Sequence, residues 1–383
     1  MRKLKLGVIG LGRAFALMAP TLARDPRVEL VGAADPRAEA LRQFESEFRG
    51  RAYTVVKDLI KDPQVEAIYI ATPHEHHAEQ AVAAAAAGKH VLVEKPMALS
   101  VDECREMVAA ARKHGVALIV GHSHSFDLPV LHARRLIESG RFGRVRMISA
   151  LNYTDFLYRP RRPEELRNAV LNQSSHHVDI VRLLAPAPLK AVRAHTGMWD
   201  AARPAEGAYA ALLKIEGGAF ASLVYSGYAH FDSDEFMGWI GESGQKKDPA
   251  QYGAARKALA GRDELSFKNA RNYGGAEFRT SEIVRHPHFG VIIVSCEKAD
   301  LRPLPNGVMI HADDEQRLEP LAAPEVPRAG VIDELYDAAV NRLTPLHDGA
   351  WGLATTEACL AILESARSGR EVPLKQQTSA SRT

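Results

Sequence analysis

Short hydrophobic runs alternate with amphipathic stretches throughout the first 122 residues. The apolar runs predict buried strands at Leu4–Ile9, Val28–Ala33, Ala67–Ala71, His90–Val93 and Ala117–Val120. The stretches between them predict helices at Arg37–Phe48, His77–Ala87 and Ser100–His114. Strands separated by helices of this length build a parallel, doubly wound sheet, so we predict an α/β domain over residues 1–122.

Long strands with few helices between them follow from about residue 123. The predicted strands are Arg144–Thr154, Lys190–Trp199, Tyr209–Ile215, Ala219–Tyr228, Ile283–Cys296 and Gly307–His311. The predicted helices are Ser174–Leu184 and, towards the end of the chain, 333–342 and 352–368. Because Gly-Gly and Pro-Asn-Gly turns divide these strands, we expect an α+β domain with a large, mostly antiparallel open sheet over 123–375.

Two segments depart from these patterns. Residues 241–275 are polar and rich in Lys, Arg, Gly and Gln. A loop of this length inside a domain is usually functional or disordered, so a substrate lid, a subunit arm and a mobile insertion all remain open. Residues 376–383 are predicted to form a disordered tail.

The composition supports two domains and narrows the functional class. A chain of 383 residues exceeds one ordinary core. Its 49 Lys+Arg against 47 Asp+Glu give no general attraction to nucleic acid or membranes. The three cysteines, Cys104, Cys296 and Cys359, have neither metal-ligand spacing nor a disulfide pattern. The N-terminus has no signal-peptide pattern, so we expect a cytoplasmic protein.

A glycine turn follows the first predicted strand. Gly10 and Gly12 are the first two glycines of a G-x-G-x-x-G turn, which brings a pyrophosphate to a helix N-terminus. Phe15 replaces the third glycine, which implies a shifted helix or a ring turned outward. Asp35 ends the next strand, 23 positions after Gly12 and close to the ~20 expected for a ribose-binding acid. The turn therefore predicts a dinucleotide site.

The same residues bear on the choice between NAD and NADP. Asp35 accepts hydrogen bonds from ribose hydroxyls and repels a 2′-phosphate, which favours NAD. Arg37 lies two positions on and is able to receive that phosphate, which leaves NADP open.

A lysine stands at the carboxyl end of a predicted strand, in the tripeptide Glu94-Lys95-Pro96. Ligands bind along this edge of α/β sheets. Lys95 has the chemistry to bind a substrate hydroxyl and relay its proton, and Glu94 to anchor the lysine or a cofactor group. A surface lysine in a strand-to-helix turn is the alternative.

Several motifs resemble one family in their order and spacing, the Gfo/Idh/MocA oxidoreductases. The matching motifs are GVIGLG (7–12), ATPHEHH (71–77), AGKHVLVEKPMAL (87–99), LNQSSHHVDIVRLL (171–184) and the closing LESARSGREVPL (363–374). The resemblance covers essentially the whole chain. It implies an N-terminal Rossmann domain and a C-terminal α/β domain whose open sheet builds homo-oligomers.

The resemblance also implies roles for individual residues. The family's D-x-x-x-H-x-x-D pattern matches Asn172, His176 and Asp179, which makes Lys95 and His176 the catalytic candidates. Asn172 departs from the pattern, because an amide orients a hydroxyl but cannot act as a base. A helix-surface histidine is the alternative for His176. The expected cofactor-binding residues are Gly10, Gly12, Arg13, Ala14, Asp35, Arg37, Thr72, Pro73, His74, His77, Glu94 and Lys95.

Basic residues indicate the substrate class. His122 and His124 alternate in GHSHSFD (121–127), and Arg159, Arg161 and Arg162 cluster in YRPRRPEEL (158–166). Clustered arginines receive carboxylates, although a solvated basic loop balanced by its own glutamates is the alternative. The full set of expected substrate-binding residues is His122, His124, Arg159, Arg161, Arg162, Asn172, His177 and Asp179.

These segments, with HPHFGVIIVSCEKADLR (286–302), are similar to a narrower branch of the family, the phthalate cis-4,5-dihydrodiol dehydrogenases. That resemblance implies oxidation of a carboxylated ring cis-diol to a catechol with NAD. A sugar or inositol dehydrogenase and a non-catalytic dinucleotide sensor remain alternatives. The clustered histidines make a zinc enzyme a further alternative. However, no HExxH motif occurs and the family chemistry needs no metal, so we expect no metal ion in the site.

Overall fold

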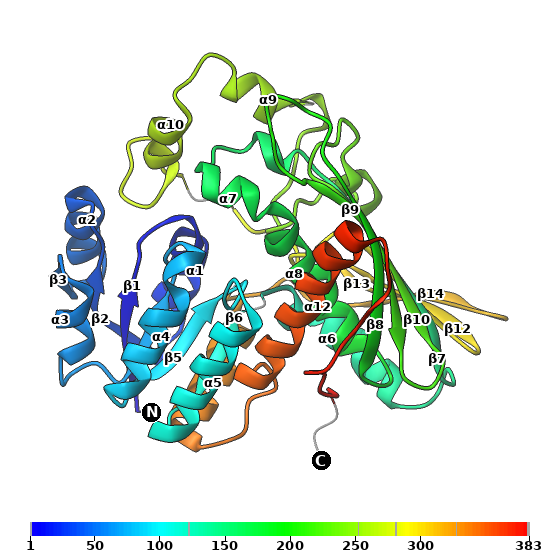
Figure 1. Ribbon diagram of the computed structural model, residues 1–383, viewed down its shortest axis with the longest axis horizontal. Coiled ribbons are helices and arrows are strands. Elements are labelled where there is room, and N and C mark those ends of the chain that lie inside the picture. Colours follow the sequence, from blue (N-terminus) through cyan, green and yellow to red (C-terminus); the bar gives the residue numbers. More distant parts are fainter. Residues whose placement is uncertain (1, 122, 252, 280–281, 327, 381–383) are drawn as a thin grey trace. The chain divides into compact units, whose positions relative to one another are not determined.

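The computed structural model describes residues 2–121, 123–251, 253–279, 282–326 and 328–380. The chain divides into two compact units (Figure 1). The first unit comprises Met1–His122, Ser266–Thr280 and Val326–Thr356, and the second comprises Ser123–Leu265, Ser281–Glu325 and Glu357–Thr383.

The first unit is built on a six-stranded sheet in the order β3-β2-β1-β4-β5-β6, in which every pair is parallel. Its strands are β1 (Leu4–Ile9), β2 (Val28–Ala34), β3 (Arg51–Tyr53), β4 (Ala67–Ile70), β5 (His90–Glu94) and β6 (Leu118–Gly121). Its helices are α1 (Arg13–Arg24), α2 (Ala38–Phe48), α3 (Val56–Lys61), η1 (His74–His76), α4 (His77–Ala86) and α5 (Val101–His114). All four residues of β4 are buried, as expected for a strand covered on both faces. The predicted doubly wound sheet is confirmed.

Two later parts of the chain return to the first unit. In the second of them, α11 (Ala329–Tyr336) and the π-helix η6 (Asp337–Asn341) precede α12 (Gly349–Ser368). The Tyr336 hydroxyl donates to the Arg2 carbonyl at 2.8 Å, and Val120 N–H donates to the His347 carbonyl at 2.9 Å. This division differs from the predicted boundaries, which assigned all of 123–375 to the second domain. An amphipathic pattern shows that a helix has a buried face but not which sheet that face covers.

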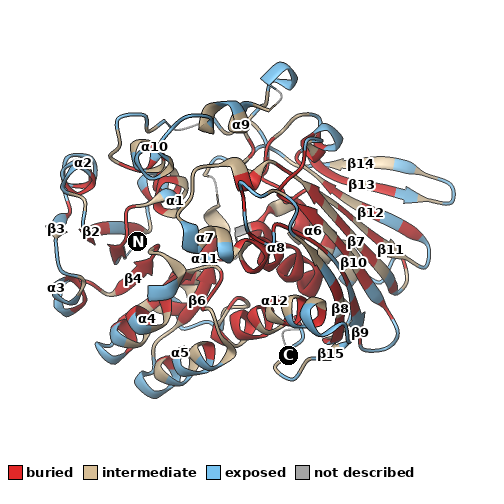
Figure 2. Cartoon of the chain, turned by 45° about the horizontal axis from the view of Figure 1, so that its top comes forward, coloured by how far each residue is buried: buried red, intermediate tan, exposed pale blue. Residues whose placement is uncertain are grey.

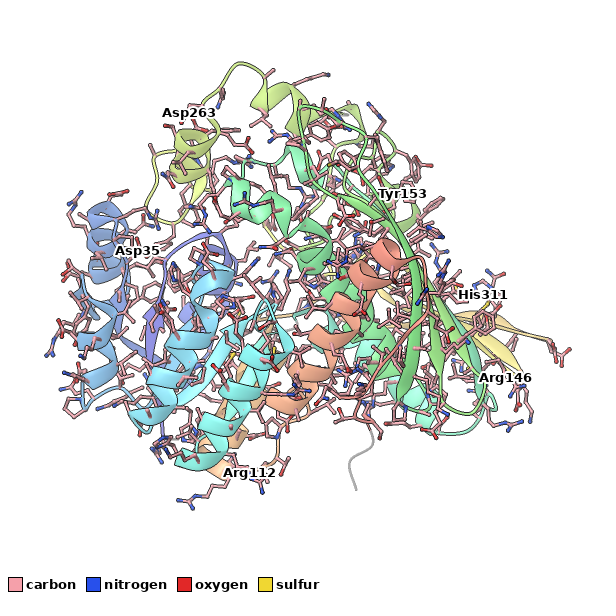
Figure 3. All side chains as sticks on the ribbon, in the orientation of Figure 1. Asp35, Arg112, Arg146, Tyr153, Asp263 and His311 are labelled. Atoms are coloured by element: carbon pink, nitrogen blue, oxygen red, sulfur yellow. The ribbon has the colours of Figure 1, made fainter. Side chains whose placement is uncertain are left out.

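The second unit contains a nine-stranded sheet in the order β14-β13-β12-β11-β7-β10-β9-β8-β15. Its strands are β7 (Val145–Tyr153), β8 (Leu189–Gly197), β9 (Ala208–Ile215), β10 (Phe220–Ser226), β11 (Val291–Cys296), β12 (Ala299–Leu304), β13 (Gly307–Ala312), β14 (Gln316–Pro320) and β15 (Val372–Pro373). Only the β7–β10 pair among these named strands is parallel, so the predicted antiparallel sheet is confirmed. Figure 3 labels Arg146 and Tyr153 near the two ends of β7, and His311 on β13.

Helices α6 (Leu128–Glu138) and α8 (Ala169–Leu184) pack against this sheet. Every residue of α8 except Asn172 is buried, and Figure 2 shows the helix almost entirely in the colour of buried residues. A helix that is buried on all sides belongs to a core. The strands alternate in exposure instead, and Leu212 and Phe220 are exposed on β9 and β10. The homo-oligomer expected through this sheet stays a prediction.

The strand predicted over Ile283–Cys296 is wrong in its first half. The strand begins only at Val291, because Pro287 cannot donate to a ladder and Gly290 has φ +76°. Two histidines of the irregular part bond carbonyl oxygens, His286 at Ala322 (2.7 Å) and His288 at Ile240 (2.8 Å).

The polar insertion 241–275 is structured. It contains η5 (Pro249–Gln251), α9 (Ala254–Leu259) and α10 (Glu264–Arg271), and Figure 3 labels Asp263 just before α10. The start of the predicted disordered tail is also held, since Arg182 donates to the Thr378 hydroxyl at 3.0 Å and Ala380 is buried. Residues 381–383 lie outside the described part. Among described helices, none has the length and hydropathy needed to span a membrane.

Candidate functional site

The glycine turn between β1 and α1 leaves space at a helix N-terminus. Gly10 has φ +90°, and a Cβ there would lie 2.8 Å from the Ala71 carbonyl oxygen. A Cβ at Gly12, the N-cap of α1, would meet nothing within 4 Å. Arg13 is exposed and Ala14 half-buried in the first turn of the helix. The turn therefore fits the pyrophosphate of a dinucleotide.

Asp35 follows β2 and is buried beside this turn (Figure 3). Its Oδ2 accepts from Leu11 N–H at 2.7 Å, and its Oδ1 accepts from Arg37 N–H at 2.9 Å and Arg37 Nε at 3.1 Å. The guanidinium of Arg37 also donates to the Leu11 carbonyl at 2.7 Å and the Tyr273 carbonyl at 3.0 Å. Arg37 is thus folded onto Asp35 by bonds within the first unit.

Phe15, at the position of the missing third glycine, is fully buried. Its ring meets Tyr273 edge-on at 4.9 Å between centroids, and lies 6.2 Å from Phe48 and 6.3 Å from Phe44 on α2. The outward-turned ring that the sequence suggested is therefore wrong, because residues 266–280 supply an aromatic partner that no local pattern reveals.

Lys95 is half-buried and directly follows β5, before the cis Lys95–Pro96 bond. The neighbouring Glu94 accepts from the Tyr69 hydroxyl at 2.6 Å. The buried ring of His77 contacts the carbonyl oxygens of both Thr72 and Pro96 at 3.0 Å, and burial lowers the pKa of His77. His77 thereby ties the turn after Lys95 to the loop after β4.

The loop after β4 carries the other expected cofactor residues. Thr72 donates its hydroxyl to Gln80 Oε1 at 2.7 Å, and His74 lies 5.6 Å from His77 between ring centroids. Thr72, Pro73 and His74 are all half-buried. Since β4 and β5 are parallel neighbours, these residues and Lys95 follow the same edge of the sheet.

In the second unit, His176 on α8 belongs to an aromatic cluster. Its ring lies 4.4 Å from Phe289 and 4.7 Å from His124 between centroids, and His176 is 8% exposed. His124 is buried with its Nδ1 2.9 Å from Asp127 Oδ2. His124 and His176 are therefore neighbours within the second unit, whereas His122 lies outside the described residues.

The other expected residues of α8 differ in their surroundings. His177 is fully buried, its Nδ1 lies 2.8 Å from the Tyr209 hydroxyl, and burial lowers its pKa to about 3. A buried, neutral imidazole with this hydrogen bond has a structural role in the core. Asn172 is half-buried and accepts from Gln173 Nε2 at 2.6 Å, and Asp179 is buried.

Arg159 is paired with acidic residues of the second unit. Its guanidinium lies 3.0 Å from Glu242 Oε2 and 3.2 Å from Asp155 Oδ1. Burial opposes ionisation of Glu242, but the charge of Arg159 outweighs it and lowers the pKa of Glu242 to about 2. Asn152 also donates to Glu242 at 3.3 Å. Arg159 is therefore largely neutralised.

The two neighbouring arginines have different surroundings. Arg162 is the N-cap residue of α7 (Pro163–Arg167), and its Nε lies 3.5 Å from Glu165 Oε1. The guanidinium carbon of Arg161 lies 3.6 Å from the centroid of the Phe156 ring. Within the described part of the chain, its buried Nε has no hydrogen-bond partner.

The charge of Arg161 is nevertheless retained at neutral pH. Burial lowers the pKa of Arg161 to about 10; the charge of Glu165 opposes this shift, and that of Arg159 adds to it. A half-buried guanidinium whose buried Nε lacks a hydrogen-bond partner among the described residues is a suitable receptor for an anion.

Sequence reasoning missed three residues that organise these sites, namely Phe289, Glu242 and Tyr273. Phe289 contacts His124, His176 and His177. In the sequence, its motif HPHF contributes only to a resemblance and does not indicate an aromatic cluster. Glu242 and Tyr273 lie in the polar insertion, where no periodicity marks a buried partner. No cluster of three or more metal-ligating side chains occurs among the described residues.

Two family models match the chain. Residues 4–122 match the oxidoreductase family with an NAD-binding Rossmann fold, and residues 130–245 match the GFO/IDH/MocA C-terminal domain. The relatives include a Comamonas testosteroni protein named 1-carboxy-3-chloro-3,4-dihydroxycyclo hexa-1,5-diene dehydrogenase. It is 45% identical over 377 residues, which are 95% of each chain. Inositol 2-dehydrogenase 2 of Saccharopolyspora erythraea is 31% identical over 68% of this chain and 78% of its own.

A solved structure agrees with these matches. A crystal structure from Bordetella bronchiseptica RB50 is 41% identical and superposes with a TM-score of 0.91, covering 97% of this chain and all of the other. The two family matches and the full-length relatives lead to one conclusion: the chain belongs to the Gfo/Idh/MocA family of oxidoreductases and is a dehydrogenase.

Proposed function

We propose that this dehydrogenase uses NAD to oxidise a carboxylated aromatic cis-dihydrodiol, with cis-4,5-dihydroxy-4,5-dihydrophthalate the leading case. The observation that carries the proposal is Arg161, a half-buried cation whose buried Nε has no hydrogen-bond partner in the described residues. The Comamonas relative supports it, because the name of that protein describes a ring diol bearing a carboxyl group.

Asn172 fits the same substrate class. An amide at this position adds no negative charge beside a substrate with two carboxylates, whereas an aspartate would repel them. Asn172 is the one residue of α8 that is only half-buried, and its Oδ1 accepts from Gln173. The second unit therefore combines a cation and a neutral amide with the His176 cluster.

The chemistry assigned to the protein's own residues is proton transfer. A bound nicotinamide dinucleotide would supply the hydride acceptor. One hydroxyl of the diol loses its proton, for which Lys95 and His176 are the proposed acceptors, and the same carbon loses a hydride. The resulting hydroxy-enone tautomerises to a catechol, and the gain of aromaticity makes oxidation favourable.

Phthalate, which carries the two carboxylates but no diol, should inhibit the enzyme competitively against the dihydrodiol. Benzoate should inhibit less strongly and cyclohexanol not at all, because the arginine contact requires a carboxylate. Initial rates at several inhibitor concentrations measure this. Indifference to phthalate would favour the alternative, a sugar or inositol dehydrogenase, for which the Saccharopolyspora relative is the specific support.

NAD should be preferred to NADP in kcat/KM, because Asp35 repels a 2′-phosphate and Arg37 is bonded to Asp35 instead of facing outward. Asp35→Ala removes the repulsion and releases Arg37. It should therefore lower the ratio of kcat/KM for NAD to that for NADP by about tenfold or more. Asp58→Ala changes an exposed carboxylate of α3 and should leave the preference unaltered. A wild-type preference for NADP would contradict this assignment.

A further inference from the structure

We infer that residues 266–279 determine cofactor selectivity, with Tyr273 as a positioning residue that keeps Arg37 away from a 2′-phosphate. This inference rests on the proposed preference for NAD. It assigns to the polar insertion a role in the dinucleotide site of the first unit.

The segment is packed firmly on the first unit. Tyr273 is fully buried, with its ring edge-on to Phe15 at 4.9 Å and its hydroxyl 2.7 Å from Glu47 Oε2. Gly274 has φ +80°, and a Cβ there would lie 2.6 Å from Ala40 Cα. The backbone therefore lies directly on α2, at a distance that only glycine permits.

The Tyr273 hydroxyl acts as a donor. Burial raises the pKa of Tyr273, and its hydrogen bond to Glu47 raises it further, so the hydroxyl stays protonated. Phe278 adds a second ring of the same segment, 5.5 Å from Tyr273 between centroids. Aromatic contacts on both sides and a hydrogen bond to α2 thus fix the position of residue 273.

The fixed position matters because the backbone at Tyr273 binds Arg37. The Tyr273 carbonyl accepts from Nη1 at 3.0 Å, while Nη2 donates to the Leu11 carbonyl at 2.7 Å and Nε donates to Asp35 at 3.1 Å. All three nitrogens of the guanidinium are therefore engaged. A phosphate is held best by two parallel N–H bonds from one arginine. To donate two N–H groups to a 2′-phosphate, Arg37 would have to break its hydrogen bonds to Asp35, Tyr273 or Leu11.

Phe15 connects the Tyr273–Arg37 contact to the glycine turn. A third glycine would leave space beside α1, whereas Phe15 fills that space and provides the surface on which Tyr273 rests. Removing the Tyr273 ring would leave a cavity beside Phe15 and loosen the segment. Arg37 would then lose its carbonyl partner and become available to a 2′-phosphate.

The test is the ratio of dissociation constants for NADPH and NADH, measured on the full-length protein by fluorescence titration without substrate. Tyr273→Ala should lower this ratio about tenfold, mainly by tightening NADPH. Tyr273→Phe keeps the aromatic packing but loses the hydrogen bond to Glu47, so it should lower the ratio only about threefold. Arg279→Ala removes an exposed side chain that donates to the Ala276 and Phe278 carbonyls of the same segment, and it should match wild type.

The outcomes separate the two proposals. A wild-type ratio near one would refute the NAD preference and with it the inference. A high wild-type ratio that a folded Tyr273→Ala leaves unchanged would refute the role of Tyr273 alone. If Tyr273→Ala does not fold, Glu47→Ala removes the hydrogen bond from the exposed side of α2. It should lower the ratio about threefold, and an unchanged ratio would again refute the inference.

Discussion

Lys95→Ala and His176→Ala should each lower kcat by ~10²–10⁴-fold while changing the dissociation constant of NADH only a few-fold. Each substitution removes a proposed proton acceptor. Loss of such a group raises the barrier of the chemical step, while the glycine turn, Asp35 and the loop after β4 still provide most of the contacts expected to hold the dinucleotide. Steady-state kinetics give kcat, and fluorescence titration gives NADH binding.

Matched controls are available on α5. Lys113→Ala and His114→Ala change exposed residues of the same types and should retain wild-type turnover. Near-normal turnover of either test variant, with a folded protein, would remove that residue from the proposed chemistry. If both residues serve one proton transfer, the double variant should lose little more than the worse single variant.

Arg161→Gln should lower kcat/KM for a carboxylated cis-dihydrodiol by about 1.5–3 kcal/mol in transition-state binding, or roughly 10- to 150-fold. Glutamine keeps polarity and approximate length but loses the charge. Arg161→Lys should recover only part of the loss, because an ammonium lacks the two-pronged geometry. A cis-dihydrodiol without carboxylates should be oxidised equally by wild type and variant.

The neighbouring arginines show why Arg161 is the informative position. Arg159→Gln would leave Glu242 without its ion-pair partner. A lower kcat/KM in this variant would therefore reflect weaker folding as well as weaker substrate binding. Arg167→Gln is the cleaner control, since Arg167 is exposed and pairs with Glu164 of the same helix at 3.2 Å. An Arg161→Gln variant with unchanged kinetics on the carboxylated diol would contradict the assignment.

The sequence predicts the architecture well where a local pattern has one physical cause. Fully buried parallel strands require continuous apolar runs, so four of the six strands in the first sheet begin at the predicted residue. The edge strand β3 was missed because it is short and none of its three residues is buried. In the second sheet, β12 and β14 were missed because polar residues interrupt them, and β15 was missed because it has only two residues.

The sites were less predictable, because they depend on which distant segments pack together. The arginine cluster was visible in the sequence, but Glu242, which neutralises Arg159, is 83 positions away. Phe15 replaces a glycine of the turn, and the sequence gives no reason for this because its ring partner, Tyr273, lies far along the chain. Patterns of three or four residues contain no information about such pairings.

The most direct test of the central claim compares substrates under identical conditions with NAD. We predict that cis-4,5-dihydroxy-4,5-dihydrophthalate is oxidised with a kcat/KM at least ~10²-fold above those of myo-inositol and glucose, which lack the carboxylates that Arg161 would bind. NADH formation at saturating NAD measures all three. Comparable kcat/KM for myo-inositol or glucose, or no turnover of the dihydrodiol, would contradict the proposed function.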